Sequence, residues 1–286
     1  MQRSGYRRQI ARAPRLQVPG GIYHVFARGN ERRTIYRDDE DRDCFLDLLG
    51  STLARQSWSL FSFCLMKNHY HLLVRTPNTD LSAGMHFVNA VYAQRFNRRH
   101  DRVGHLFQGR FKARLVQDGP RLLWTARYIA RNPIEAGRRE PPSERRWNSH
   151  WAVLGLVPPW QVDTRTLLGL FHPDLQRARQ LYREYVELEV ADDDDLHADP
   201  LHPLIDGDRE YIEAQLARIV PMREYPKSLI SPPRPALSEL LGRSPAAADL
   251  AVAHAAGYSF REIGRQLGLH KSTISRRLGG GATIET

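Results

Sequence analysis

Hydrophobic positions in the first half of the chain follow two periods, and these periods predict its secondary structure. Segments in which apolar residues alternate with polar ones, rich in β-branched and aromatic side chains, predict strands. Segments with apolar residues at helical spacing predict amphipathic helices. The predicted strands are 21–27, 58–66, 69–75 and 111–116, and the predicted helices are 39–56, 81–99 and 120–131. This order predicts an α+β fold with a ferredoxin-like antiparallel sheet and helices on one face.

The second half of the chain reads as mostly helical. A proline-rich segment at 228–237 precedes a region in which Phe260–Leu267 and Lys271–Leu278 are predicted helices separated by a turn at Gly268. Ile263, Leu267, Leu269 and Ile274 would form its small core, and Gly264 would permit close helix packing. We therefore expect an all-helical C-terminal region. The predicted domains are a basic arm at 1–18, an α+β domain at 19–155, an acidic helical connection at 156–227 and a C-terminal domain at 228–286.

Composition excludes several classes of protein. The chain has 286 residues, 41% of them hydrophobic and 26% charged, which is ordinary for a globular protein. Its two cysteines, Cys44 and Cys64, exclude a disulfide framework and a cysteine-rich zinc site. No apolar run reaches the roughly 18 residues of a membrane span, and the basic N-terminus lacks the apolar core of a secretory signal. We expect a cytoplasmic protein without a membrane partner.

The distribution of charge along the chain indicates a class of ligand. The net charge is +10, and 42 basic residues face 32 acidic ones. Residues 1–160 carry a net +14, residues 161–220 carry −8 and residues 221–286 carry +4. Two basic units around an acidic divider predict binding to nucleic acid at both ends of the chain.

Two histidines in the predicted strand 69–75 are a candidate metal pair. Side chains at positions i and i+2 of a strand point to the same face, so His69 and His71 would project side by side. The alternative is a pair of partly buried sheet histidines. Zinc is disfavoured because no cysteine or third histidine lies close in the sequence.

Tyr128 and Asn132 share one face near the end of the predicted helix 120–131, because they lie four residues apart. The phenol oxygen of Tyr128 could act as a nucleophile, and the amide oxygen of Asn132 could complete a metal site. The alternative is a core tyrosine, with Asn132 closing the helix before Pro133.

Four segments in the right order resemble a known family. The segments CLMKNHYHLLVRTP, RGNERRTIY, HLFQGRFK and YIARNPIEAG resemble the HUH single-tyrosine transposases, and more narrowly the REP-associated tyrosine transposases of bacteria. The resemblance covers about residues 15–155. His69-Tyr70-His71 would be the HUH motif, although Tyr70 stands where the family usually has a bulky hydrophobic residue.

The resemblance implies an enzyme that cleaves and rejoins single-stranded hairpin DNA. Tyr128 would attack phosphorus to give a 5′-phosphotyrosine link and a free 3′-OH, while His69, His71 and Asn132 would hold one Mg²⁺ or Mn²⁺. We expect a monomer. Further contacts to DNA are expected from residues of the two glycine-containing loops and the N-terminal arm, namely Arg28, Asn30, Arg32, Arg33, Gln108, Arg110, Arg7, Arg8 and Arg12.

The C-terminal pattern resembles the helix-turn-helix of DNA-binding proteins. The residues expected to face duplex DNA are Lys271, Ser272, Thr273, Arg276 and Arg277. Two other functions stay open from the sequence: a non-catalytic regulator that binds DNA through this unit, and an RNA-binding ferredoxin-like domain. The second lacks the aromatic stacking signature that such RNA readers need.

Overall fold

The structure is a computed structural model in which the chain forms two compact units, residues 1–230 and 231–286. It describes residues 15–135, 147–157, 160–188, 201–219, 235–241, 245–256 and 258–279. No helix within these ranges is long and apolar enough to cross a membrane. Three arm residues expected to bind DNA, Arg7, Arg8 and Arg12, lie outside them.

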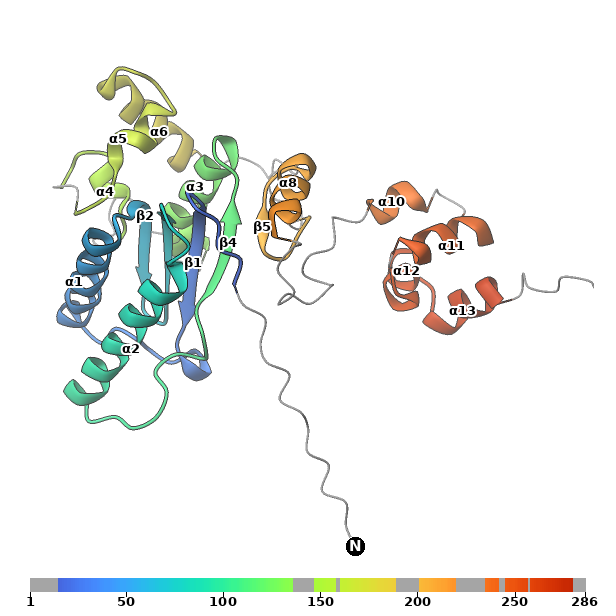
Figure 1. The fold of residues 1–286 in the computed structure, drawn as a ribbon, viewed down its shortest axis with the longest axis horizontal. Coiled ribbons are helices and arrows are strands. Elements are labelled where there is room, and N and C mark those ends of the chain that lie inside the picture. Colours follow the sequence, from blue (N-terminus) through green and yellow to red (C-terminus); the bar gives the residue numbers. More distant parts are fainter. Residues whose placement is uncertain are drawn as a thin grey trace, which may run out of the picture. The chain divides into compact units, whose positions relative to one another are not determined.

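The first unit is built on a five-stranded sheet with the order β2-β3-β1-β4-β5 (Figure 1). The strands are β1 Ile22–Arg28, β2 Ser59–Met66, β3 His69–Arg75, β4 Lys112–Val116 and β5 Ile205–Asp206. The first four strands pair antiparallel in the ferredoxin-like order, which confirms the predicted fold class. The two-residue strand β5 was not predicted; it pairs parallel with β4 and is too short to give a periodic signal.

Helices cover both faces of this sheet, not one as predicted. The helices before residue 136 are α1 Asp39–Gln56, α2 Leu81–Arg99 and α3 Pro120–Glu135. Tyr70 of β3 packs against Phe45 of α1 and donates a hydrogen bond from its hydroxyl to Asn89 of α2, so α1 and α2 cover its face. The ring of His71 points to the other face, where it meets Tyr128 of α3. The alternation of strand side chains therefore separates a core face from a cleft face.

Helix α3 is longer than the pattern predicted. It continues through Pro133 to Glu135, whereas the sequence suggested an end at Asn132. A proline inside a helix removes one N–H donor, here the partner of the carbonyl four residues earlier. Only two helical residues follow Pro133, so little helix remains to be disrupted.

The predicted N-terminal arm is wrong for its last four residues. Leu16 and Val18 are buried in the core, and the guanidinium of Arg15 donates to the carbonyl of Phe111 at 2.8 Å. The apolar side chains of 15–18 thus tie this segment to the sheet.

The segment after residue 147 packs onto the same unit through short helices. These are α4 His150–Val153, α5 Thr164–Gly169, α6 Leu175–Glu187 and α8 Arg209–Ile219. Ala178, Tyr182 and Val186 of α6 are buried in the main core. This region, for which no role was predicted, therefore supports the sheet and α3.

Acidification should destabilise this unit through His150, which is fully buried. Burial lowers the pKa of His150 to about 4, and the nearby Arg183 acts in the same direction. This outweighs Glu187, whose carboxylate lies 3.5 Å from Nε2. Between about pH 6.5, the ordinary histidine pKa, and about pH 4, the unfolded chain binds the proton and the folded chain does not. The free energy of unfolding therefore decreases as the pH is lowered through this window, by up to about 3 kcal/mol.

Denaturant titrations at pH 7 and pH 4.5 measure this effect, with His150→Gln as the comparison. The glutamine variant does not titrate and can still hydrogen-bond the hydroxyl of Tyr182, which lies 3.2 Å from Nδ1 in the parent. Its loss of stability on acidification should be smaller. Equal losses in the two proteins would contradict the role given to His150.

In the described part of the second unit, four short helices surround a separate core. They are α10 Leu237–Leu240, α11 Ala247–Ala255, α12 Phe260–Gln266 and α13 Lys271–Gly279. Ile263 and Ile274 are fully buried, and Leu267 and Leu269 pack against them, as predicted. A Cβ at Gly264 would lie 2.5 Å from the carbonyl oxygen of Leu269, so glycine allows the close approach of α12 to the turn.

Candidate active site

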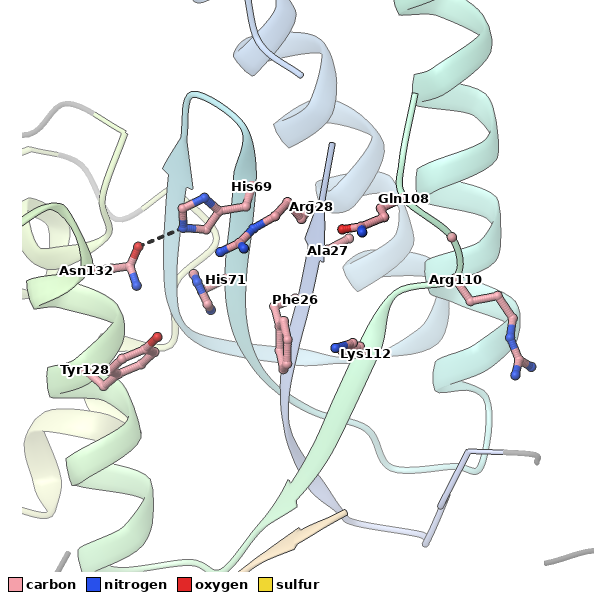
Figure 2. Close-up of a pocket in the computed structure, with 11 residues that line it drawn as sticks. Phe26, Ala27, Arg28, His69, His71, Gln108, Arg110, Lys112, Tyr128 and Asn132 are labelled. Atoms are coloured by element: carbon pink, nitrogen blue, oxygen red, sulfur yellow. Dashed lines mark hydrogen bonds between the residues drawn. The ribbon is translucent and has the colours of Figure 1, made fainter. Parts of the chain in front are cut away.

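The cleft face of the sheet carries a cavity of about 630 Å³ between the sheet and α3 (Figure 2). Seven of the residues singled out from the sequence line it: Arg28, His69, His71, Gln108, Arg110, Tyr128 and Asn132. The lining residues that the sequence reading missed are Phe26, Ala27, Gly109 and Lys112. The tertiary structure thus brings together segments that are far apart in the chain.

Strand pairing places the two candidate metal-binding histidines. His69 lies opposite Arg28 and His71 opposite Phe26 in the antiparallel pair of β1 and β3. Their rings project to the cleft face with centroids 5.1 Å apart. The intervening Tyr70 is fully buried on the core face, where burial raises its pKa well above the usual range.

Helix α3 presents the other two residues one turn apart. The Tyr128 ring lies edge-on to the His71 ring at 5.6 Å between centroids, and it stacks on Trp124 of the preceding turn. The amide oxygen of Asn132, which is buried, lies 3.0 Å from Nε2 of His69. Tyr128 and Asn132 therefore lie on one side of α3, as their spacing predicted, and this side contacts the histidines.

The donor set of this cleft fits a hard cation. His69 has carbonyl-type oxygens at both ring nitrogens: Asn68 Oδ1 at 2.7 Å from Nδ1 and Asn132 Oδ1 at 3.0 Å from Nε2. A neutral imidazole carries one N–H and satisfies only one of these acceptors. With a neutral ring and the amide oriented as it is here, the other contact joins two acceptors, and a cation between Nε2 and Oδ1 would satisfy both.

His71 is suited to ligation because it stays neutral. Burial lowers its pKa well below the usual range, and the neighbouring His24, His69 and Arg28 act in the same direction. Within the described residues, no group of three or more histidine, cysteine, aspartate or glutamate side chains is arranged to hold a metal. The amide oxygen of Asn132, 3.0 Å from Nε2 of His69, is the oxygen donor nearest to this histidine among the contacts described.

His24 is the third histidine that the sequence did not place near the pair. Its Nε2 lies 2.8 Å from Nδ1 of His71, in hydrogen-bonding contact. Burial lowers the pKa of His24 to about 3, so it remains neutral and able to accept. The two-residue alternation of His24, Phe26 and Arg28 along β1 was the available signal for this shared face.

The charge of the cleft favours an anionic ligand. Arg28, Arg110 and Lys112 line it, and none of the described residues in its lining is a carboxylate. The other loop residues expected to bind DNA lie elsewhere. Arg32 and Arg33 line a second cavity. Asn30 is not among the described residues that line either cavity, and its backbone N–H donates to the carbonyl of Leu106.

Helix α3 is fixed from its outer side by α6. The guanidinium of Arg127 donates to the carbonyls of Tyr185 at 2.6 Å and Leu188 at 2.8 Å, and Arg131 donates to Val186 at 2.8 Å. These carbonyls belong to the last turn of α6, where backbone acceptors have no partner within the helix. The contact satisfies them with positive charge and orients the helix that carries Tyr128 and Asn132.

Removing Arg127 should loosen this helix. In Arg127→Met, two charged hydrogen bonds are lost at a buried position, so the free energy of unfolding should fall by about 1.5–3 kcal/mol. Denaturant titration measures the loss. Arg183→Met, at an exposed arginine of α6, is the matched control and should stay within about 0.5 kcal/mol of the parent. Equal stabilities in both variants would exclude the proposed contact as a support of α3.

The comparisons with known proteins give a family similarity for each end of the chain. Residues 17–132, which include all four candidate residues, match the family model described as "Transposase IS200 like". This part of the chain is thus similar to the IS200-like transposases. Residues 249–279 match the model described as "Helix-turn-helix domain", which confirms the expected C-terminal motif.

Two further comparisons concern whole proteins. No curated protein matches the chain. A solved structure described as a REP-associated tyrosine transposase bound to a REP hairpin is similar over 51% of this chain and 87% of that chain. The identity is 17% and the TM-score is 0.43.

In the helix-turn-helix unit, the residues expected to face DNA lie on α13. Lys271, Ser272, Arg276 and Arg277 are exposed, and Thr273 is partly exposed. The buried Ile274 between them anchors the helix to the core. The unit that resembles a transposase is thus followed along the chain by a second unit that carries exposed basic residues on α13.

Proposed function

We propose that this protein is a metal-dependent tyrosine transposase that cleaves and rejoins single-stranded hairpin DNA through a 5′-phosphotyrosine intermediate. One observation carries the proposal: His69, His71, Asn132 and Tyr128 line a single basic cleft although they come from a strand and a helix about 60 residues apart. The hairpin form of the substrate is what the resemblance to REP-associated tyrosine transposases implies.

In this mechanism His69, His71 and Asn132 would hold one Mg²⁺ or Mn²⁺. A divalent ion there would polarise the scissile phosphate and offset charge that develops in the transition state. Arg28 and Lys112 bind the flanking phosphates by charge, and Tyr128 supplies the attacking oxygen. Because one phosphodiester is exchanged for another, the reverse attack by a 3′-OH rejoins strands without an external energy source.

The helix-turn-helix unit adds a second mode of DNA binding. Helix α13 carries exposed Lys271, Arg276 and Arg277, which suit the major groove and its phosphates. We propose that this unit binds duplex DNA while the cleft binds the single strand, and that the protein acts as a monomer.

A covalent adduct tests the catalytic proposal. The protein is incubated with Mn²⁺ and labelled single-stranded hairpins from the repeats of its own genome, and the products are separated on a denaturing gel. We expect a protein-linked DNA band that is absent with EDTA and with the same sequence as a perfect duplex. A protein that binds the hairpins but forms no adduct on any of them is a regulator and not a transposase of this mechanism.

The hydrogen bond from His71 to His24 should control metal affinity. For His71 to offer a lone pair at Nε2, its Nδ1 must carry the proton and donate it to His24 Nε2, 2.8 Å away. His24→Phe keeps an aromatic ring but removes the acceptor. We expect Mn²⁺ binding, measured by calorimetry without DNA, to weaken about 10–100-fold.

Rescue distinguishes this orienting role from simple damage to the fold. His24→Gln restores an acceptor near His71 and should recover part of the Mn²⁺ affinity, whereas both variants should unfold at similar denaturant concentrations. Unchanged affinity in His24→Phe would show that His24 only fills space.

A further inference from the structure

A second cavity of about 470 Å³ lies at the turn between β2 and β3. Three of its lining residues are basic, Arg32, Arg33 and Lys67, and among the described residues none that lines it is acidic. The remaining lining residues are Thr34, Met66, Asn68 and His69. The cavity therefore offers positive charge and polar donors, a combination that suits the phosphates of a nucleic acid.

Hydrogen bonds between two loops build this cavity. The backbone N–H of Gly29 donates to the carbonyl of Asn68 at 2.8 Å, and the N–H of Ile35 donates to that of Lys67 at 2.9 Å. The side-chain amide of Asn68 in turn donates to the carbonyl of Arg32 at 3.0 Å. These bonds hold the basic loop against the end of the strand that carries His69.

The backbone of the basic loop is strained. Glu31 and Arg32 have positive φ angles of 53° and 58°, a conformation that residues other than glycine rarely adopt. A Cβ at Gly29 would lie 2.1 Å from the carbonyl oxygen of Arg33, so this position requires glycine. Such strain persists only where the surrounding contacts enforce it, and it concentrates at functional sites.

The two cavities meet at His69, which lines both of them. Tyr128 lines only the first, and its ring contacts that of His71. Figure 2 shows His69 near the β2–β3 turn and Tyr128 beyond His71. The candidate metal ligands thus lie between Tyr128 and the second cavity.

This order has a consequence for displacement at phosphorus. In an in-line attack the leaving oxygen departs on the side opposite the nucleophile. A bond forms between the Tyr128 oxygen and phosphorus, and the bond from phosphorus to O3′ breaks. The electron pair stays on O3′, which takes a proton to give the 3′-OH, while the phenol proton passes to solvent. With Tyr128 on one side of the histidines, O3′ leaves towards His69 and the second cavity.

We propose that the second cavity binds the sugar-phosphate backbone of the DNA segment that ends in the 3′-OH, and so retains it for rejoining. The proposal rests on the proposed function and assigns one flank of the cleaved strand to Arg32 and Lys67. After cleavage the other flank is held covalently by Tyr128, whereas the 3′-OH segment has only noncovalent contacts. Arg33 pairs with Glu31 at 2.6 Å, but both side chains are mostly exposed, so this ion pair is weak and can yield to phosphate.

The double variant Arg32→Gln/Lys67→Gln tests the proposal. It removes two charges and leaves the backbone hydrogen bonds of the loop in place. The matched control is Arg95→Gln/Arg98→Gln, which removes two exposed charges on α2 from residues that line neither cavity. The substrate is a hairpin oligonucleotide that gives the adduct, labelled either at its 5′ end or at its 3′ end.

The two labels separate cleavage from retention. The 3′ label reports the adduct on a denaturing gel, and the 5′ label reports the 3′-OH segment that stays bound on a native gel. In the cavity variant we expect adduct formation within about threefold of the parent, and retention and rejoining reduced about tenfold or more. The control variant should match the parent in both readouts. Unchanged retention in the cavity variant, or loss of adduct formation in the cavity variant but not in the control, would overturn the proposal.

A binding experiment covers the case in which no adduct forms with any protein. That result would end the proposed function and with it the assignment of the 3′-OH segment. Titration of fluorescent oligo-dT at several salt concentrations would then show whether the cavity binds single-stranded DNA at all. Each lost phosphate contact should reduce the slope of log affinity against log salt by about 0.7. A slope equal to that of the control variant would exclude the cavity as a DNA site.

Discussion

Tyr128→Phe should abolish the covalent protein–DNA adduct and leave single-stranded DNA binding unchanged. The substitution removes the attacking oxygen and keeps the ring, which stacks on Trp124 and contacts His71. Because a phenylalanine cannot form a phosphodiester, the adduct should fall below detection, a larger effect than any change in positioning would give. Denaturing gels with labelled hairpin DNA measure the adduct, and fluorescence anisotropy measures binding.

The matched control is another tyrosine of the same unit. Tyr211→Phe removes a hydroxyl that lies 3.5 Å from the carbonyl of Val116, away from the cleft, and should leave the adduct intact. An adduct that forms equally well with Tyr128→Phe would show that another residue is the nucleophile. Loss of DNA binding in this variant would instead point to a role of the hydroxyl in recognition.

Asn132→Ala should have the second largest effect, a fall of about 100–1000-fold in the rate of adduct formation. Its amide oxygen lies 3.0 Å from Nε2 of His69 and is the candidate oxygen ligand that contacts a histidine of the pair directly. Without it, two imidazoles remain, and a hard ion prefers oxygen. The variant should therefore need much more Mn²⁺ for half-maximal rate, and calorimetry should show weaker Mn²⁺ binding in the absence of DNA.

Asn132→Asp separates ligation from packing. A carboxylate of the same size still offers an oxygen to a cation, so Mn²⁺ binding should be retained or strengthened. Asn132→Ala with parental Mn²⁺ affinity would contradict the ligand role, and equal stability of the two variants in denaturant would exclude a difference in folding as the cause.

The local pattern of the sequence was sufficient to predict most helices and strands of the first unit. The helices at 39–56 and 81–99 and the strand at 69–75 have their predicted bounds. Each buries one face, so the apolar positions recur at the period of the element. The elements that escaped prediction have no such period: the two residues of β5 are too few, and the last turn of α3 follows a proline that usually marks an end.

The candidate site divides in the same way. Spacing alone placed His69 beside His71 on one strand face and Tyr128 beside Asn132 on one helix face, and the resemblance of the motifs joined the two pairs. Lys67 and Lys112 carry no local signal of this kind. Their places depend on strand register and on the loop contacts that bring 29–35 to the β2–β3 turn.

The sequence by itself determined the period of each main element, the two like-facing residue pairs and the basic character of the chain, because these depend on neighbours within a few positions. Only the tertiary structure decided that α3 covers the face opposite α1 and α2, that α6 holds α3 in place, and that His69 stands between two cavities. These features depend on pairing and packing between segments that are distant in the chain, and such contacts leave no periodic trace in the residues that make them.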